Sequence, residues 1–169
     1  MGQDMKIIAP TQGCGGLACE LACREQPCQR RRMGEVKVNV KMSNSIDVGM
    51  FRRGLLTREQ IRTVNVEAVV DTGAVRSCIP VGLKEQLGLE TVRHISAQLA
   101  DGSTHTVEQT EAVDMEILDR IVPEACIVRG SEVLIGQTAL AATDLRVDGN
   151  RQKVIPHPDH PHATVIRIR

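Results

Sequence analysis

The acid with the most informative surroundings in this sequence is the aspartate of Val69-Val70-Asp71-Thr72-Gly73-Ala74. Apolar residues that run into an acid and then a glycine are typical of a buried strand that ends abruptly and exposes one carboxylate. Such a carboxylate can accept or donate a proton during hydrolysis, and the glycine lets another chain approach the backbone. An isolated aspartate after a strand more often caps a turn. A second apolar pair with a glycine, Leu134-Ile135-Gly136, follows much later and favours the catalytic interpretation.

These two stretches, in this order, resemble the signature of the retropepsin-like aspartic peptidases, the single-lobed, retroviral type of acid protease. Between them, Ala100-Asp101-Gly102-Ser103 is similar to the tip of that family's flap, the hairpin that covers the substrate. The resemblance extends from about Gly34 to Gly149. It implies a mainly β fold, a small closed β-barrel with one or two short helices.

The resemblance also assigns roles to the matching residues. It implies that Asp71 is catalytic, that Thr72, Gly73 and Ala74 form the active-site loop, and that Leu134, Ile135 and Gly136 are structural. Hydrolysis by carboxylates needs one ionised and one protonated acid, and each chain carries one Asp-Thr-Gly. The expected enzyme is therefore an aspartic endopeptidase that acts on peptide or protein substrates as a homodimer, without a cofactor or metal.

Two other functions remain alternatives. The first is a binding or dimerisation module that keeps the peptidase fold but is catalytically silent. The second is a metal-responsive protein that depends on the cysteines near the N-terminus.

Two positions depart from the family pattern. Arg76 stands where a small or polar residue is expected, and its charge could act on the neighbouring acid or bind a substrate carboxylate. The family often has an Arg-Asp or Arg-Asn pair where this sequence has Gln137-Thr138. The second departure leaves open how the helix expected there is joined to the strand before it.

Composition excludes several other classes of function. The 21 basic residues balance the 21 acidic ones, and Phe51 is the only aromatic residue, so a nucleic-acid surface with stacking platforms is not expected. No apolar run is long enough to span a membrane, and no secretory signal is recognisable, so we expect a cytoplasmic protein. Its core must consist of aliphatic residues, which suits a small barrel.

The sequence divides into three parts. Residues 1–33 are expected to form a poorly ordered leader whose cysteines, with the spacing C-x4-C-x3-C-x4-C, are more typical of free thiols than of a metal site: Cys14, Cys19, Cys23 and Cys28. Residues 34–150 form the expected peptidase domain. In residues 151–169, His157, His160 and His162 alternate with prolines, which favours a solvated tail over a metal site. Residues 164–169 could add a strand to a dimer interface.

Periodicity predicts the elements that position these residues. Alternation predicts half-buried strands, and an Asp101-Gly102 pair predicts a two-residue hairpin turn. Cys78 is interpreted as a small buried residue rather than a reactive thiol, and Pro123 as a break between strands. The expected strands are 36–42, 64–70, 75–79, a hairpin over 96–106, 113–117, 125–128, 132–135 and a final barrel strand at 145–149; the expected helices are 83–87, closed by Gly88, and 137–142; and 43–62 is expected to be a turn and a loop.

Overall fold

The computed structural model of the chain describes residues 35–98 and 102–165. The chain divides into two units, Met1–Arg32 and Met33–Arg169. All described residues belong to the second unit, so the cysteine-rich leader and its metal candidates lie outside them. The elements are β1 (Val36–Asn44), α1 (Ser45–Arg52), a 3-10 turn (Arg58–Gln60), β2 (Thr63–Val70), β3 (Cys78–Ile79), α2 (Val81–Gln86), β4 (Thr91–Gln98), β5 (Thr104–Ile117), β6 (Arg120–Val128), β7 (Leu134–Ile135), α3 (Gln137–Ala142), β8 (Leu145–Asp148) and β9 (Lys153–Pro156).

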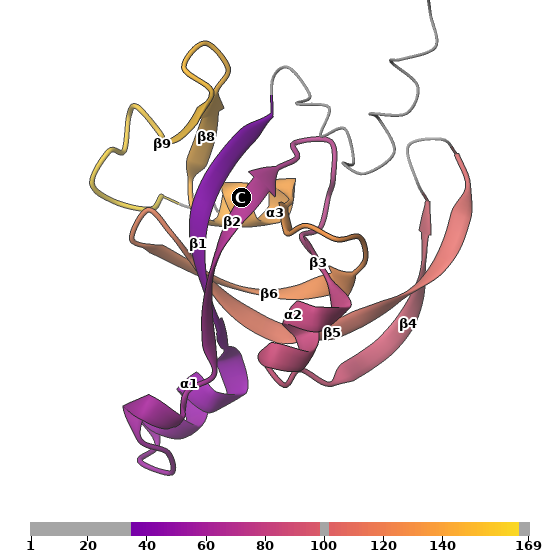
Figure 1. The fold of residues 1–169 in the computed structure, drawn as a ribbon. Helices are drawn as coiled ribbons and strands as arrows, with labels where there is room; N and C mark the ends of the chain where they lie inside the picture. The colour runs from indigo at the N-terminus through magenta and orange to yellow at the C-terminus, as the bar shows by residue number, and fades with distance from the viewer. Residues whose placement is uncertain (1–34, 99–101, 166–169) are drawn as a thin grey trace, which may run out of the picture. The chain divides into compact units, whose positions relative to one another are not determined.

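Most of these strands belong to one sheet. Within the described residues it has seven strands in the order β1-β2-β7-β3-β6-β5-β4, and β1 pairs additionally with β5 (Figure 1). The fold is therefore mainly β with short helices, as the sequence predicts. Three α-helices are present in this part of the chain, rather than the one or two expected.

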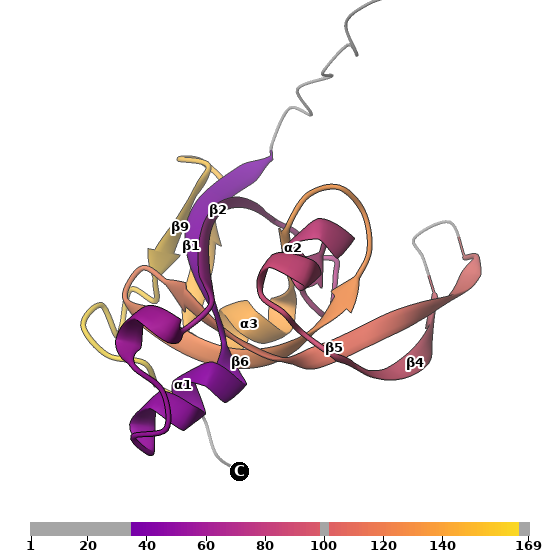
Figure 2. The ribbon, with the colours of Figure 1, turned by 60° about the horizontal axis from the view of Figure 1, so that its bottom comes forward.

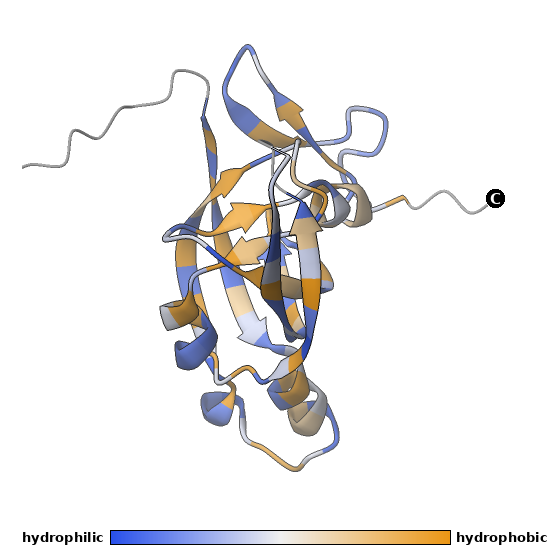
Figure 3. Cartoon of the chain, turned by 90° about the vertical axis from the view of Figure 1, so that its right-hand side faces the viewer, coloured by the Kyte–Doolittle hydropathy of each residue, from blue (hydrophilic) through white to orange (hydrophobic). Residues whose placement is uncertain are grey.

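The alternation in β1 and β2 determines how these strands pair. Val36 lies opposite Val70, and Met42 lies opposite Val64, in one continuous antiparallel ladder. Along β1 the valines and Met42 are buried or half-buried while the lysines and Asn39 are exposed. Figure 3 shows the same change between hydrophobic and hydrophilic residues along the strands. The strands predicted by period-two alternation are confirmed here.

The core is aliphatic, as the composition requires. Among its fully buried members, Met42, Ile79, Leu87, Met115 and Ile135 show no exposed surface. Phe51, the one aromatic residue of the chain, is outside this core and is 40% exposed on α1. Burial of branched and flexible aliphatic side chains therefore supplies the main stabilising term, in proportion to the apolar area removed from water.

Helix α1 corrects the expected turn and loop over 43–62. Asn44 caps the helix, because its side-chain oxygen accepts the N–H groups of Ile46 and Asp47 at 2.9 and 3.2 Å. The buried Asp47 carboxylate in turn accepts from Nε and Nη2 of Arg62, both at 2.7 Å. Asp47 and Arg62, whose charges suggest a solvated loop in the sequence, are thus paired with each other. Figures 1 and 2 show the segment with α1 projecting beyond β1 and β2.

Pro123 does not break the chain, which corrects a second prediction. It lies inside β6, opposite Asp114 of β5. Leu118 and Asp119, both with positive φ, form the two-residue turn that joins these strands. In an antiparallel hairpin the pairs alternate between hydrogen-bonded and non-hydrogen-bonded, starting here from the hydrogen-bonded pair Ile117–Arg120. The pair Asp114–Pro123 is therefore non-hydrogen-bonded, and the missing N–H of Pro123 removes no bond to β5. On the other side β6 pairs with β3 only near its end, at Ile127 and Val128, so the missing N–H costs little.

The segment after α3 also differs from expectation. Strand β8 does not join the main sheet but pairs with β9 in a separate two-stranded sheet. Leu145 and Val154 from these strands are buried in the core. The prediction of a solvated tail is wrong for His157, which is 7% exposed. Thr164 and Val165 are not in a strand, and the rest of the predicted terminal strand lies outside the described residues. Each helix of the described part is too short or too polar to span a lipid bilayer.

Candidate active site

The two sequence motifs lie at the carboxyl ends of two neighbouring parallel strands, β2 and β7, and so on the same side of the sheet. In β2 and β7, Val69 pairs with Leu134 and Val70 pairs with Ile135. The ladder continues beyond β2, because the backbone N–H of Asp71 donates to Ile135 O at 3.0 Å. The apolar pair of each motif is therefore held in the sheet, and Asp71 and Gly136, which follow these pairs, lie at the ends of adjacent strands.

Asp71 lies at the point where β2 leaves the sheet. Its Oδ1 accepts the N–H of Gly73 at 2.9 Å, and its carbonyl accepts the N–H of Ala74 at 3.2 Å. Asp71 itself is half-buried, while Thr72 and Gly73 are exposed. The turn thus fixes the direction of the carboxylate within its own loop and leaves it within reach of solvent or of another molecule.

Gly136 lets the chain after β7 pass close to the backbone of Arg76 and Ser77. A Cβ built on Gly136 would lie 2.5 Å from the carbonyl carbon of Arg76 and 2.9 Å from Ser77 N, both backbone atoms that cannot move aside. The N–H of Gly136 donates to Ser77 Oγ at 3.1 Å. Glycine is required here by close approach of two backbones. This crossing also shortens the predicted return strand 75–79 to the two residues of β3.

The start of α3 is joined to the Asp71 loop despite the unusual Gln137-Thr138 pair. The N–H of Gln137 donates to Ala74 O at 2.8 Å, and the N–H of Thr138 donates to Val75 O at 3.1 Å. The Thr138 hydroxyl donates to the same Val75 carbonyl at 2.6 Å. Backbone donors at the helix N-terminus, which any residue type offers, therefore make most of this connection.

Glu124 is a buried acid beneath this crossing, and we had no expectation for it from the sequence. Its Oε2 accepts from the Ser77 hydroxyl at 2.8 Å, and Oε1 lies 3.7 Å from Nη1 of Arg76. The side chain is 2% exposed, and Oε1 has no hydrogen-bond partner among the described residues. The available signal was a lone carboxylate inside the apolar run of residues 121–128. Glu124 and Ser77 thus hold the loop that carries Arg76 against Gly136.

Cys78 is half-buried beside this network. Burial raises the pKa of its thiol, and Sγ lies 3.9 Å from the carbonyl of Arg76. A thiol that resists deprotonation is a poor nucleophile. The structure therefore agrees with a small, packed residue rather than a reactive one. Burial raises the pKa of Cys126, which shows no exposed surface, well above its usual range.

The predicted flap is the β4–β5 hairpin, although Ala100 and Asp101 lie outside the described residues. Gln98 pairs with Thr104, which leaves five residues between the paired positions. The predicted two-residue turn falls partly on residues 99–101, outside the described part of the chain. Gly102, which is described, has a φ of +83, a left-handed conformation that favours glycine. Ser103 Oγ lies 3.1 Å from His105 Nε2. In Figure 1 the outer ends of β4 and β5 rise on the same side as the β2–β3 connection.

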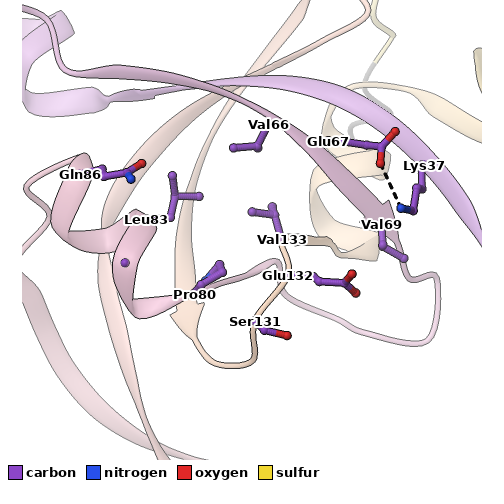
Figure 4. A pocket seen from close by; sticks show the side chains of 11 residues that line it. Lys37, Val66, Glu67, Val69, Pro80, Leu83, Gln86, Ser131, Glu132 and Val133 are labelled. Atoms are coloured by element: carbon purple, nitrogen blue, oxygen red, sulfur yellow. Dashed lines mark hydrogen bonds and ion pairs between the residues drawn. The ribbon is translucent and has the colours of Figure 1, made fainter. Parts of the chain in front are cut away.

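A pocket of 510 Å³ lies away from Asp71. Figure 4 shows it between β2, α2 and residues 131–133, with the Lys37–Glu67 ion pair at one side. Leu83 and Val133 line its apolar part, and no residue of the 71–74 loop contributes to it. A second pocket, of 450 Å³, lies beside β1 and the Leu118-Asp119 turn. Neither pocket includes Asp71 or another residue of the 71–74 loop among its lining residues.

Comparison with known proteins gives the family. Residues 58–142 match the family described as "gag-polyprotein putative aspartyl protease". Among solved structures, the chain is similar to the retroviral protease-like domain of Ddi1 from Leishmania major, with 16% sequence identity, coverage of 72% of this chain and 83% of that chain, and a TM-score of 0.45. No curated protein sequence matches the chain. Because the family match spans half of the chain and includes both Asp71 and Gly136, this protein belongs to the gag-polyprotein aspartyl protease family and has its retropepsin-like fold.

Proposed function

We propose that the protein is an aspartic endopeptidase that works as a homodimer, with Asp71 of each chain forming the catalytic pair. The observation that carries the proposal is the position of Asp71. It ends a buried strand, its Oδ1 is fixed by Gly73 N, and it is half-exposed at the edge where β2 and β7 end. A carboxylate used only to cap a turn would not need the crossing of Gly136 behind it.

The need for a dimer follows from the number of acids. Asp71 is the only acidic residue in the two segments 71–77 and 134–138. Peptide hydrolysis by carboxylates requires a base that takes a proton from water and an acid that protonates or polarises the scissile carbonyl. A second copy of the chain, related by a two-fold axis, supplies the missing group. Two carboxylates a few ångströms apart do not ionise together, so the pair shares one proton, and its two pKa values belong to the pair.

We further propose that the β4–β5 hairpin, with Ala100, Asp101, Gly102 and Ser103 at its tip, covers an extended peptide that binds as an added strand. Backbone hydrogen bonds then provide affinity, and side-chain pockets provide selectivity. We also infer that the sheet closes as a barrel, which the pairing of β1 with both β2 and β5 supports.

The decisive test is Asp71→Asn. The amide is nearly isosteric with the carboxylate but cannot act as a base, so we expect cleavage of a denatured peptide library to fall by about 10³-fold or more. Asp119→Asn is the matched control, because it makes the same change at an exposed turn residue, where asparagine tolerates the positive φ of 64°. The control is expected to cleave like the wild type.

The same proteins, run on an analytical ultracentrifuge, test the dimer. The wild type and both variants are expected to sediment as dimers at the concentration at which the wild type is active. Equal cleavage by the wild type and Asp71→Asn would exclude the aspartic mechanism. Dimers of the wild type without cleavage over about pH 3 to 8 would favour the silent binding or dimerisation module instead.

A further inference from the structure

Three residues able to bind a metal gather at the other end of α3 from the active-site loop. They are Asp144, His157 and His160, and one ligand atom from each lies within 4.8 Å of the others. His157 is 7% exposed, and the side chains of Asp144 and His160 are 12% and 28% exposed. The peptidase chemistry proposed above does not use any of them.

The β8–β9 hairpin brings these residues together. Leu145 pairs with Pro156, so Asp144 and His157 are the next positions outward, and His157 N donates to Asp144 O at 3.0 Å. A turn then returns His160 to the same place, because His160 N donates to His157 O at 2.9 Å. The two imidazole rings stack with their centroids 4.8 Å apart. Backbone pairing, rather than the side chains themselves, therefore holds this arrangement.

A buried arginine fixes the backbone on both sides of the cluster. Nη1 of Arg120 donates to the carbonyls of Thr143 and Asp144, and Nη2 donates to the carbonyl of His160, all at 2.8 Å. Its Nη1 also lies 3.9 Å from Asp144 Oδ2. With its donors used by carbonyls, Arg120 acts mainly as a clamp that keeps the α3–β8 turn and the segment after β9 together. Ligands held in this way lose little conformational entropy on binding.

The donor groups have the right chemistry for a transition metal. Asp144 Oδ2 accepts hydrogen bonds from His160 Nδ1 at 2.8 Å and from Val165 N at 3.3 Å, so a carboxylate oxygen already lies beside an imidazole nitrogen. Asp159 donates its N–H to His157 Nδ1 at 3.2 Å, and its exposed carboxylate lies 3.8 Å from the same nitrogen. The exposed Asp159 carboxylate is thus close enough to His157 to supply a fourth ligand, an oxygen.

We propose that Asp144, His157 and His160 bind one divalent transition-metal ion of the zinc class. Imidazole nitrogen and carboxylate oxygen are ordinary ligands of Zn²⁺, with bonds of about 2 Å that place tetrahedral ligands about 3.4 Å apart. The observed spacing of up to 4.8 Å needs only a side-chain contraction toward the ion. The ion would replace the Asp144–His160 hydrogen bond, link the segment after β9 to the turn before β8, and compete with protons for the imidazoles.

Cobalt(II) titration of the full chain, prepared without metal, tests the proposal directly. Co²⁺ in a nitrogen and oxygen site gives visible d–d bands without the intense near-ultraviolet band of a thiolate site. The titration uses the chain with Cys14, Cys19, Cys23 and Cys28 replaced by serine as well as the natural sequence, so that the cysteines cannot supply the signal. We expect one equivalent of Co²⁺ in both proteins, displaced by Zn²⁺.

Two variants and a matched control locate the site. His160→Ala removes one ligand, and Asp144→Asn keeps a side chain that tolerates the positive φ of 52° at this position. Each is expected to weaken Co²⁺ binding by at least about tenfold, since loss of an outer partner alone has effects of that size. His162→Ala, in the same segment but exposed, is expected to bind like the parent.

Any of three results would overturn the proposal. The first is no Co²⁺ binding by the serine-substituted chain, the second is a thiolate band that accounts for all binding, and the third is unchanged affinity in both His160→Ala and Asp144→Asn. Circular dichroism of each variant shows whether it is folded, and the two variants affect different elements, so one of them remains informative if the other does not fold. None of these readouts depends on peptidase activity.

Discussion

The ends of β2 and β7 are built from the same kind of sequence but present different groups. Each strand has an apolar pair, and the two pairs lie side by side in parallel. After Val70 the chain exposes a carboxylate, Asp71, whereas after Ile135 it buries a glycine, Gly136. In the proposed enzyme the end of β2 would carry the chemistry, whereas the end of β7 provides the space in which the 71–77 loop can turn. Two similar motifs thus differ in the group that each presents, one an accessible acid and the other a buried glycine.

The two glycines show the same division. A Cβ on Gly73 would meet only Asp71 Oδ1, at 3.2 Å, which is a side-chain atom and not part of the backbone. A Cβ on Gly136 would lie 2.5 Å from a backbone carbon of the facing loop. If the comparison is correct, substitutions at the β2 end should affect catalysis, and substitutions at the β7 end should affect stability.

Gly136→Ala is expected to have the largest effect on stability. The added methyl group must separate two backbones, and we expect the free energy of unfolding to fall by about 3 kcal/mol, at the upper end for overpacking. Urea denaturation followed by circular dichroism measures it. Gly73→Ala is the matched control, with an expected loss below about 1 kcal/mol. Similar losses in the two variants would contradict the different packing of the two glycines.

Glu124→Ala is expected to destabilise by about 2 kcal/mol, because it leaves the Ser77 hydroxyl without its buried acceptor. Glu124→Gln keeps an oxygen in that place and is expected to lose less than about 1 kcal/mol. The measurement is again the urea midpoint of each variant. An equally large loss in the glutamine variant would show that the charge facing Arg76, rather than the hydrogen bond to Ser77, supports the crossing.

Asp47→Asn tests a charged pair remote from both strand ends. Hydrogen bonds from Arg62 hold the pKa of Asp47 below its usual value, so the pair stabilises the fold fully above the unfolded-state pKa of about 3.9, and this contribution is lost as pH falls through the lower folded-state pKa. We expect the variant to lose about 1–2 kcal/mol at pH 7, with Arg62 partly exposed, and to show a smaller further loss on acidification.

The measurement for Asp47→Asn is the free energy of unfolding at neutral pH and at about pH 2.5, below the unfolded-state value. Peptidase activity per folded molecule should not change, because α1 does not contact the 71–77 loop through any hydrogen bond in the described part of the chain. A variant with the same acid sensitivity as the wild type would contradict the assigned role of the pair.

Thr138→Val is expected to have the smallest effect. It removes the hydroxyl donor to Val75 O but keeps the backbone N–H that donates to the same carbonyl. We expect a loss of about 0.5–1 kcal/mol in the free energy of unfolding. Thr138→Ser restores the hydroxyl and serves as the control. A loss above that of Glu124→Ala would mean that the side chain, and not the helix backbone, joins α3 to the Asp71 loop.

Local patterns in the sequence predicted much of the sheet. The alternation over 36–42 and 64–70 matches β1 and β2, the alanine-rich stretch 137–142 matches α3, and Gly88 closes α2 with a φ of +58. These features depend on residues close in sequence, so they can be read from a single chain. The placement of Asp71 at a strand end was predicted for the same reason.

Other features depended on partners far apart in the chain. Helix α1 could not be predicted because Asp47 is paired with Arg62, and Pro123 was misjudged because its effect depends on which edge of β6 is paired. Glu124 beneath the crossing had no recognised role until Ser77 and Arg76 were placed beside it. Similarly, proline-spaced histidines predicted a solvated tail until β9 paired with β8.

The amino-acid order by itself is enough to indicate the alternating strands β1 and β2, the aliphatic core and the acid at the end of β2, since each of these depends on side-chain type and local spacing. The tertiary structure was needed to show that Gly136 leaves no room for a Cβ, which would lie 2.5 Å from the facing backbone, that Glu124 is buried nearby, and that Asp144 lies beside His157 and His160. The physical reason is that close packing and charge pairing depend on distances in space, and chain closure brings together residues that no local pattern relates.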